Sequence, residues 1–250
     1  MNIFELFYRI VVGLMDRLHV YEERTDKYLS YIKHYVNSAR IVVDVGCGAG
    51  TFSKALAHRQ RLVIALDVEK KPLKEIENPY IERLCADAHH IPLREGSVDC
   101  IFSLSLLEHL ENPEKCVEEL YRVLRHGGTA IIQLPNLQYP FEPHTKWPLL
   151  CLLPKRLQSR IFKMMDYPYV NMEVTIKNAL IMLQKTGFKL EKTLKIYHLG
   201  IMKLLPLAPA YILISEKEHL HTKYGESKRV VGAPKDGLKF HLNPLSSRYH

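Results

Sequence analysis

The stretch that decides the fold spans residues 41–52 and reads Ile41-Val42-Val43-Asp44-Val45-Gly46-Cys47-Gly48-Ala49-Gly50-Thr51-Phe52. Its first part is a short, mostly β-branched run, which is typical of a strand buried on both faces of a sheet. Alternating glycines follow, and because glycine permits positive φ and close backbone approach, such a turn can place N–H groups against a ligand. A strand, a glycine-rich turn and a helix start together indicate a nucleotide-binding site.

The glycine spacing distinguishes between classes of nucleotide. The order G-x-G-x-G places Thr51 where the dinucleotide fingerprint G-x-G-x-x-G has its third glycine. The spelling of residues 43–50 instead resembles the first motif of class I S-adenosylmethionine (SAM) methyltransferases. By that resemblance the loop contacts the amino-acid part of SAM through Asp44, Gly46, Cys47, Gly48 and Gly50. The alternative is a tight strand–helix turn with no ligand.

Acidic residues follow the next two predicted strands. Residues 62–67 form an apolar strand that ends at Asp67, 17 residues past Gly50. A carboxylate at this place in nucleotide-binding α/β folds accepts hydrogen bonds from ribose hydroxyls, and the resemblance gives Asp67 that role for SAM. We expect the adjacent Val68 to contact the cofactor too, while the alternative for Asp67 is a helix cap. After a third strand over residues 81–85, the pair Asp87-Ala88 resembles the loop that recognises adenine.

Two further strands complete the predicted binding edge. They cover residues 97–103 and 129–136 and end near Ser103 and Asn136. The carboxyl ends of parallel strands meet at one edge of a sheet, where α/β proteins bind ligands. We therefore expect Ser103 to join the glycine loop and the acidic residues in one cofactor site.

Residues 96–128 carry the closest family resemblance. The segment is similar to the "F-D … hEHh … P … RVLKPGG" pattern of small-molecule methyltransferases, the type 11 group, with Arg125-His126 replacing the usual Lys-Pro. Asn112 and Pro113 indicate a helix start, and Gly127-Gly128 is the expected helix stop. The resemblance implies a seven-stranded, mostly parallel, doubly wound α/β sheet with an antiparallel last strand, helices on both faces and a helical cap insertion.

The remaining segments are expected to surround this core. Helical spacing over residues 3–18 and 25–36 indicates N-terminal helices that pack on the core or cover the cofactor, with Tyr28 as a candidate contact. Proline- and aromatic-rich residues 137–174, with a helix near 155–165, indicate a lid over the acceptor. The expected division is 1–38 N-terminal helices, 39–136 SAM-binding core, 137–174 cap, 175–217 rest of the sheet and 218–250 basic tail.

Composition sets the class of protein and its partners. The 250 residues carry a formal net charge of +8 and a sequence pI of about 9.1, which indicates either an acidic partner or simply a basic surface. Five cysteines without a C-x-x-C pair favour reduced packing residues and a cytoplasmic setting. We find no convincing secretory signal and no apolar run of the ~18 residues needed to cross a bilayer. We expect no bound metal, because adjacent His89 and His90 are poorly placed to share one ion.

The first hypothesis is therefore a SAM-dependent methyltransferase acting on a small-molecule or lipid- or glycan-linked acceptor. His109, which follows the fourth strand, and His144, in the cap, are the candidate catalytic bases. The alternatives are an RNA methyltransferase that uses the basic charge and a non-catalytic, membrane-associated SAM-binding regulator. The mixture of leucines and cations in the cap is the feature that favours peripheral membrane contact, and a lid packed on its own domain is its alternative.

Overall fold

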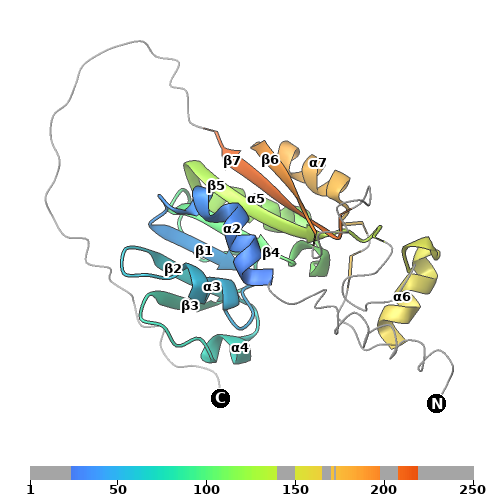
Figure 1. Ribbon diagram of the computed structural model, residues 1–250, viewed down its shortest axis with the longest axis horizontal. Coiled ribbons are helices and arrows are strands. Elements are labelled where there is room, and N and C mark those ends of the chain that lie inside the picture. The colour runs from blue at the N-terminus through green and yellow to red at the C-terminus, as the bar shows by residue number, and fades with distance from the viewer. Residues whose placement is uncertain (1–23, 140–149, 165–169, 172, 198–207, 219–250) are drawn as a thin grey trace, which may run out of the picture. The chain divides into compact units, whose positions relative to one another are not determined.

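A computed structural model describes residues 24–139, 150–164, 170–171, 173–197 and 208–218, all within one compact unit (Figure 1). The expected helix over residues 3–18, His144 and the basic tail lie outside the described residues. In chain order the elements are α2 (Arg24–Val36), β1 (Ile41–Val45), α3 (Thr51–Leu56), β2 (Leu62–Asp67), α4 (Lys70–Lys74), β3 (Ile81–Cys85), β4 (Val98–Leu104), η1 (Leu107–His109), α5 (Pro113–Val123), β5 (Leu124–Pro135), η2 (Leu150–Leu152), α6 (Lys155–Met164), α7 (Ile176–Thr186), β6 (Phe188–Ile196) and β7 (Ala210–Lys217).

The strands form one seven-stranded sheet in the order β3-β2-β1-β4-β5-β7-β6. The pairs from β3 to β5 are parallel, and β7 is antiparallel to both of its neighbours. This is the predicted doubly wound architecture with an antiparallel last strand, and it is confirmed. Parallel pairing brings the carboxyl ends of β1, β2, β3, β4 and β5 to one edge, where the ligand crevice of an open α/β sheet lies.

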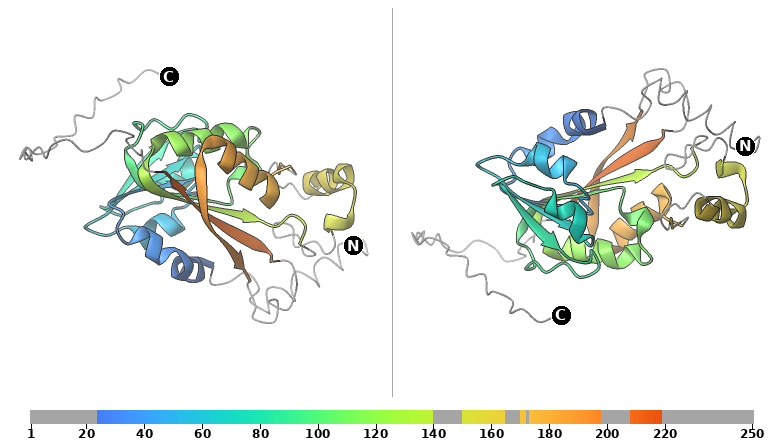
Figure 2. Two further views of the ribbon diagram at one scale, coloured as in Figure 1. Left: turned by 90° about the horizontal axis from the view of Figure 1, so that it is seen from above. Right: turned by 90° about the horizontal axis from the view of Figure 1, so that it is seen from below.

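Alternate side chains of the strands enter two separate cores. Val43 and Val45 of β1 pack in the core that includes α5 and α7. Val42 packs in the core that includes α2 and α3. Figure 2 shows these two pairs of helices on opposite faces of the sheet. Both faces are therefore covered, which explains why β1 and β2 read as nearly continuous apolar runs.

The helix α5 ends earlier than the glycine pair predicts. Its last residue is Val123, and Leu124 is already extended with φ −70° and ψ 132°. Leu124 is fully buried in the α5/α7 core and pairs with Val98 of β4. Burial of this leucine in the sheet therefore overrides continuation of the helix, and Gly127, at φ +69°, lies inside β5 instead. The prediction that Gly127-Gly128 stops the helix was wrong by several residues.

Arg61 fixes the covering helices to the sheet. Its side chain is buried, and its Nη2 donates to the carbonyl of Val36 at the end of α2 (2.7 Å). Nε donates to Ala39 O and Nη1 to Leu56 O at the end of α3, both at 3.1 Å. One guanidinium thus satisfies three main-chain carbonyls, including those that end α2 and α3.

Replacing Arg61 by Met is expected to lower the free energy of unfolding by about 2–4 kcal/mol, because buried carbonyls lose their donors. Arg59→Met, two residues away and exposed, is the control and should stay within about 0.5 kcal/mol of the parent chain. Urea denaturation followed by far-UV circular dichroism measures both. Equal denaturation midpoints for the two variants would contradict the assignment.

Candidate functional site

The glycine loop after β1 is held in a left-handed backbone conformation. Gly46, Gly48 and Gly50 have φ of +76°, +52° and +71°. The N–H groups of Gly46 and Cys47 both donate to Leu66 O of β2, at 2.8 and 3.0 Å. The loop is therefore fastened to the neighbouring strand rather than free to relax.

The three glycines are needed for different reasons. A Cβ on Gly50 would meet Ile76 Cδ1 at 2.5 Å, and one on Gly46 would meet Leu106 Cδ1 at 2.9 Å. A Cβ on Gly48 would meet no protein atom within 4 Å. Packing thus explains Gly46 and Gly50, while Gly48 leaves open space of the kind that a bound ligand fills.

Asp67 connects this loop to the end of β2. Its Oδ2 accepts the Gly48 N–H at 2.8 Å, and its Oδ1 accepts the Glu69 N–H at 2.9 Å. A carboxylate oxygen has two lone pairs, so each oxygen keeps capacity for one further donor. This geometry fits a carboxylate that receives two ribose hydroxyls while it orients the loop.

A cavity of about 220 Å³ opens beside the glycine loop on the α2/α3 face. Its lining comes from α2, β1, the loop, α3, β4 and β5. The lining residues are Tyr28, Asp44, Gly46, Cys47, Thr51, Phe52, Leu104, Ser105 and Gln133. The Tyr28 and Phe52 rings meet edge to face with centroids 5.9 Å apart. Tyr28 therefore lies in the wall of this cavity, and its role as a cofactor contact stays a prediction.

Asp44 places a buried carboxyl group in the same cavity. Its Oδ2 accepts the Ser53 hydroxyl at 2.6 Å. Burial raises the pKa of Asp44 from 3.8 to about 6, and the charge of Asp67 adds to the rise, although the Ser53 bonds oppose it. A carboxylate that is costly to ionise in isolation gains most from a cationic ligand, so this position suits an ammonium group.

Ser105 and Gln133 are among the wall residues that the sequence did not single out. Ser105 has φ +51°, which is uncommon outside glycine, and its hydroxyl donates to Gln133 Oε1 at 2.7 Å. Gln133 was visible as a polar residue inside an apolar strand. Ser105 carried no such signal, because its exposure at the cavity depends on a backbone conformation beyond the end of β4.

The predicted adenine-side residues lie beyond this cavity. The Ala86 N–H donates to Asp67 O at 3.0 Å, which brings the Asp87-Ala88 segment next to β2. Asp87 is half exposed and accepts the His89 N–H at 2.9 Å, and this bond lowers the pKa of Asp87. Val68 is 69% exposed at the same edge, as expected for a side chain that a flat ring would cover.

Other predicted site residues lie elsewhere. Ser103 is fully buried, and its neighbours Leu104 and Ser105, rather than Ser103, line the cavity. His109 is half-buried in η1, and its main-chain N–H donates to Leu106 O at 2.8 Å. The roles of Ser103 and His109 stay predictions, as does that of His144.

Two asparagines, one just before the cap and one near its end, bond to main-chain groups at the sheet edge. Asn136 donates its N–H to Pro209 O and its Nδ2 to Ala208 O, both at 2.8 Å. Asn171 donates its N–H to Glu108 O at 2.6 Å and its Nδ2 to Leu110 O at 3.2 Å. The chain therefore leaves and rejoins the core at segments adjoining the carboxyl ends of β4 and β5.

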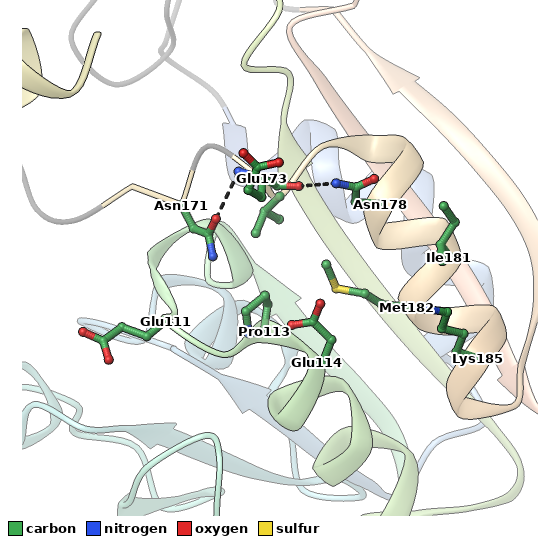
Figure 3. A pocket seen from close by; sticks show the side chains of 10 residues that line it. Glu111, Pro113, Glu114, Asn171, Glu173, Asn178, Ile181, Met182 and Lys185 are labelled. Carbon is green, nitrogen blue, oxygen red and sulfur yellow. Dashed lines mark hydrogen bonds between the residues drawn. The ribbon is translucent and has the colours of Figure 1, made fainter. Parts of the chain in front are cut away.

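A second cavity, of about 280 Å³, lies between the start of α5 and α7 (Figure 3). It shares no lining residue with the first and carries three glutamates, one lysine and two asparagines. Its lining residues are Glu111, Pro113, Glu114, Asn171, Glu173, Val174, Asn178, Ile181, Met182 and Lys185. Since α7 lies on the opposite face from α2 and α3, this cavity is separate from the glycine-loop site.

Comparisons with known proteins agree with this geometry. Residues 43–132, from β1 to β5, match a family model described as "Methyltransferase domain". The structure resembles a SAM-dependent methyltransferase from Mesorhizobium loti, with a TM-score of 0.59 over 76% of this chain and 96% of that one at 18% identity. At this identity the likeness shows the fold alone.

Sequence relatives point the same way. A probable SAM-dependent methyltransferase from Mycolicibacterium smegmatis is 27% identical over 163 residues, which cover 64% of this chain and 56% of the relative. Another from Mycobacterium tuberculosis is 32% identical over 114 residues, 45% of this chain and 41% of the relative. The matched region thus spans about half the length of these relatives.

The fold and the glycine-loop site define a class I, Rossmann-like methyltransferase domain. Residues 43–132 match the type 11 methyltransferase domain family, and the sequence relatives are named SAM-dependent methyltransferases, so the cofactor of this domain is SAM. The resemblance in residues 43–50 and 96–128 is confirmed.

The glycines provide a first test of the site. Gly48→Ala should cost about 1–2 kcal/mol of stability for its left-handed backbone and still fold, but its methyl group should weaken SAM binding at least about tenfold, a loss of ~1.4 kcal/mol. Gly50→Ala adds a clash with Ile76 and should cost about 2–5 kcal/mol. Chemical denaturation and titration calorimetry measure the two properties. Wild-type SAM affinity in Gly48→Ala would show that the open space is not the ligand site.

Asp44 gives a pH-dependent test. Its folded pKa of about 6 lies above its ordinary value of 3.8, so the folded chain binds this proton more tightly than the unfolded chain. Stability from this group therefore falls as pH rises from about 4 to 6 and remains reduced above that. In the absence of ligand, Asp44→Asn should gain on the order of 3 kcal/mol relative to wild type across this window.

Asp99→Asn is the control of opposite sign. Burial alone would raise the pKa of Asp99, but the N–H groups of Ile41 and Arg40 and the Arg125 guanidinium together lower it. This variant should lose stability relative to wild type as pH rises through the acid range. A difference between Asp44→Asn and wild type that does not change with pH would refute the shifted pKa.

Proposed function

We propose that this chain transfers a methyl group from SAM to a small-molecule or lipid- or glycan-linked acceptor. One observation carries the proposal: Asp67 Oδ2 accepts the Gly48 N–H where Gly48 leaves open space, and the adjoining loop residues Gly46 and Cys47 line a cavity together with the buried Asp44. The family match supports the cofactor, and the acceptor class rests on the type 11 resemblance.

Each residue of the site has a distinct part in holding SAM. Asp67 receives the ribose hydroxyls, and Val68 with the Asp87-Ala88 segment borders the adenine. Asp44 faces the ammonium group of the methionine part, and Tyr28 with Phe52 closes the wall of the cavity. Residues on α2, β1, β2 and the loops after β1 and β3 thus grip one ligand along its length.

Bound SAM supplies a methyl group that its sulfonium already activates. The chain therefore mainly has to align an acceptor and exclude water, and orientation of this kind supplies on the order of 7–11 kcal/mol. A histidine can accept the proton of a hydroxyl or ammonium acceptor, and we assign this part to His109 or His144.

Asp67 is the residue on which the proposal is tested. Asp67→Ala should weaken SAM binding about 30- to 100-fold, because a charged acceptor of two hydroxyl donors is lost. Glu69→Ala is the matched control, since Glu69 contacts Asp67 through its main chain and its side chain is exposed. Calorimetry with SAM measures both, and unchanged affinity in Asp67→Ala would refute the site assignment.

The variants Asp67→Ala and Glu69→Ala also test which class of acceptor is methylated. Incubation with methyl-labelled SAM and fractionated cell extract should place label in lipid or small molecules with wild type and Glu69→Ala, and far less with Asp67→Ala. Label in RNA would favour the nucleic-acid alternative instead. Tight SAM binding without label in any fraction would favour a regulatory SAM-binding protein.

A further inference from the structure

The segment from η2 through α6 exposes apolar side chains at its surface. Leu152 is 74% exposed and Leu157 is 42% exposed, which places both among the exposed large hydrophobic side chains of the described residues. Single exposed leucines are common on soluble domains, but two of them within six residues form a local apolar surface.

Exposed cations lie along one face of α6. Arg156, Arg160 and Lys163 are all exposed, and their spacing of four and three residues places them on one helix face. The opposite face is buried through Gln158 and Phe162. Residues 150–164 contain no aspartate or glutamate, so the surface has only one sign of charge.

The segment is attached to the rest of the domain on its other side. Lys155 forms an ion pair with Glu173, and Gln158 Nε2 donates to Leu153 O at 2.7 Å. Glu173 follows Asn171, whose side chain and main chain bond to the residues after β4. Within the described residues, the exposed face of α6 is thus left uncovered while its buried side anchors it near the edge that binds the cofactor.

The pattern of charge and apolar side chains selects one kind of partner. Leucines between arginines and a lysine match the headgroup boundary of a bilayer, where the apolar chains insert and the cations meet anionic phosphates. Nucleic acid offers bases that stack on aromatic rings, whereas the aromatic residue of α6, Phe162, is buried. In the part of the chain that is described, no helix is long and apolar enough to cross a membrane.

We propose that this surface, made of Leu152, Arg156, Leu157, Arg160 and Lys163, docks on an anionic phospholipid bilayer. Docking requires neither SAM nor an acceptor, so it stands independently of the proposed activity. Where both hold, the anchored segment brings the cofactor-binding edge to acceptors at the bilayer surface.

Vesicle cosedimentation of the full chain is the test. Wild type should bind vesicles made of phosphatidylcholine and phosphatidylglycerol. It should bind vesicles of phosphatidylcholine alone far less. Arg156→Glu/Arg160→Glu should lower the partition coefficient at least about 25-fold, at about fivefold for each cation lost. Lys192→Glu/Lys195→Glu on the exposed edge strand β6 makes the same change of charge elsewhere and should bind nearly as well as wild type.

Leu152→Ser/Leu157→Ser separates the apolar contribution from the charge. This variant should keep its preference for anionic vesicles but lose the binding that survives at high salt, where cations are screened. Unchanged far-UV circular dichroism and urea denaturation midpoints show that each variant is folded. Failure of wild type to bind anionic vesicles, equal loss in the β6 control, or full binding by Arg156→Glu/Arg160→Glu would overturn the proposal. Binding of RNA instead of vesicles would overturn it as well, if that binding is lost when the residues of this surface are changed.

Discussion

The site depends on one hydrogen bond, from the Gly48 N–H to the carboxylate of Asp67. It joins the turn after β1 to the last residue of β2, so two neighbouring parallel strands define the positions of the loop and the acid together. The Leu66 carbonyl adds two further bonds to the same turn. Because both partners are fixed by the sheet, the loop needs little reorganisation when a ligand arrives, which is the physical basis of preorganised binding.

Around that contact, three carboxyl groups differ in how far they are buried. Asp44 is withdrawn from water on the α2/α3 face, while Asp67 and Asp87 remain accessible at the edge. Burial raises the pKa of Asp44, whereas the hydrogen bond from the His89 N–H lowers the pKa of Asp87. A ligand that is cationic at one end and rich in hydroxyl and amine donors at the other end complements this gradient. The elongated, asymmetric cofactor of the family has that distribution of groups.

Much of this could be read from the sequence because the core obeys local rules. The apolar run that ends in Asp67 gave the bounds of β2, the predicted strand over residues 81–85 matches β3, and Thr175 and Gly187 cap α7. The end of α5 could not be read in this way, because the burial of Leu124 depends on pairing with a strand that lies far away in the chain. Ser105 and Leu104 were not predicted as cavity residues for a similar reason, since the side chains that line a cavity are set by tertiary placement rather than by periodicity.

The asparagines near the two ends of the cap affect how the cap can vary between related proteins. Asn136, just before the cap, and Asn171, near its end, each donate to main-chain carbonyls of the core. An insertion that is fixed near both ends can change in length and composition without altering the register of the strands. The shared family region ends at residue 132, just before the first of these asparagines. The cap can therefore vary while the cofactor-binding half of the domain keeps its strand register.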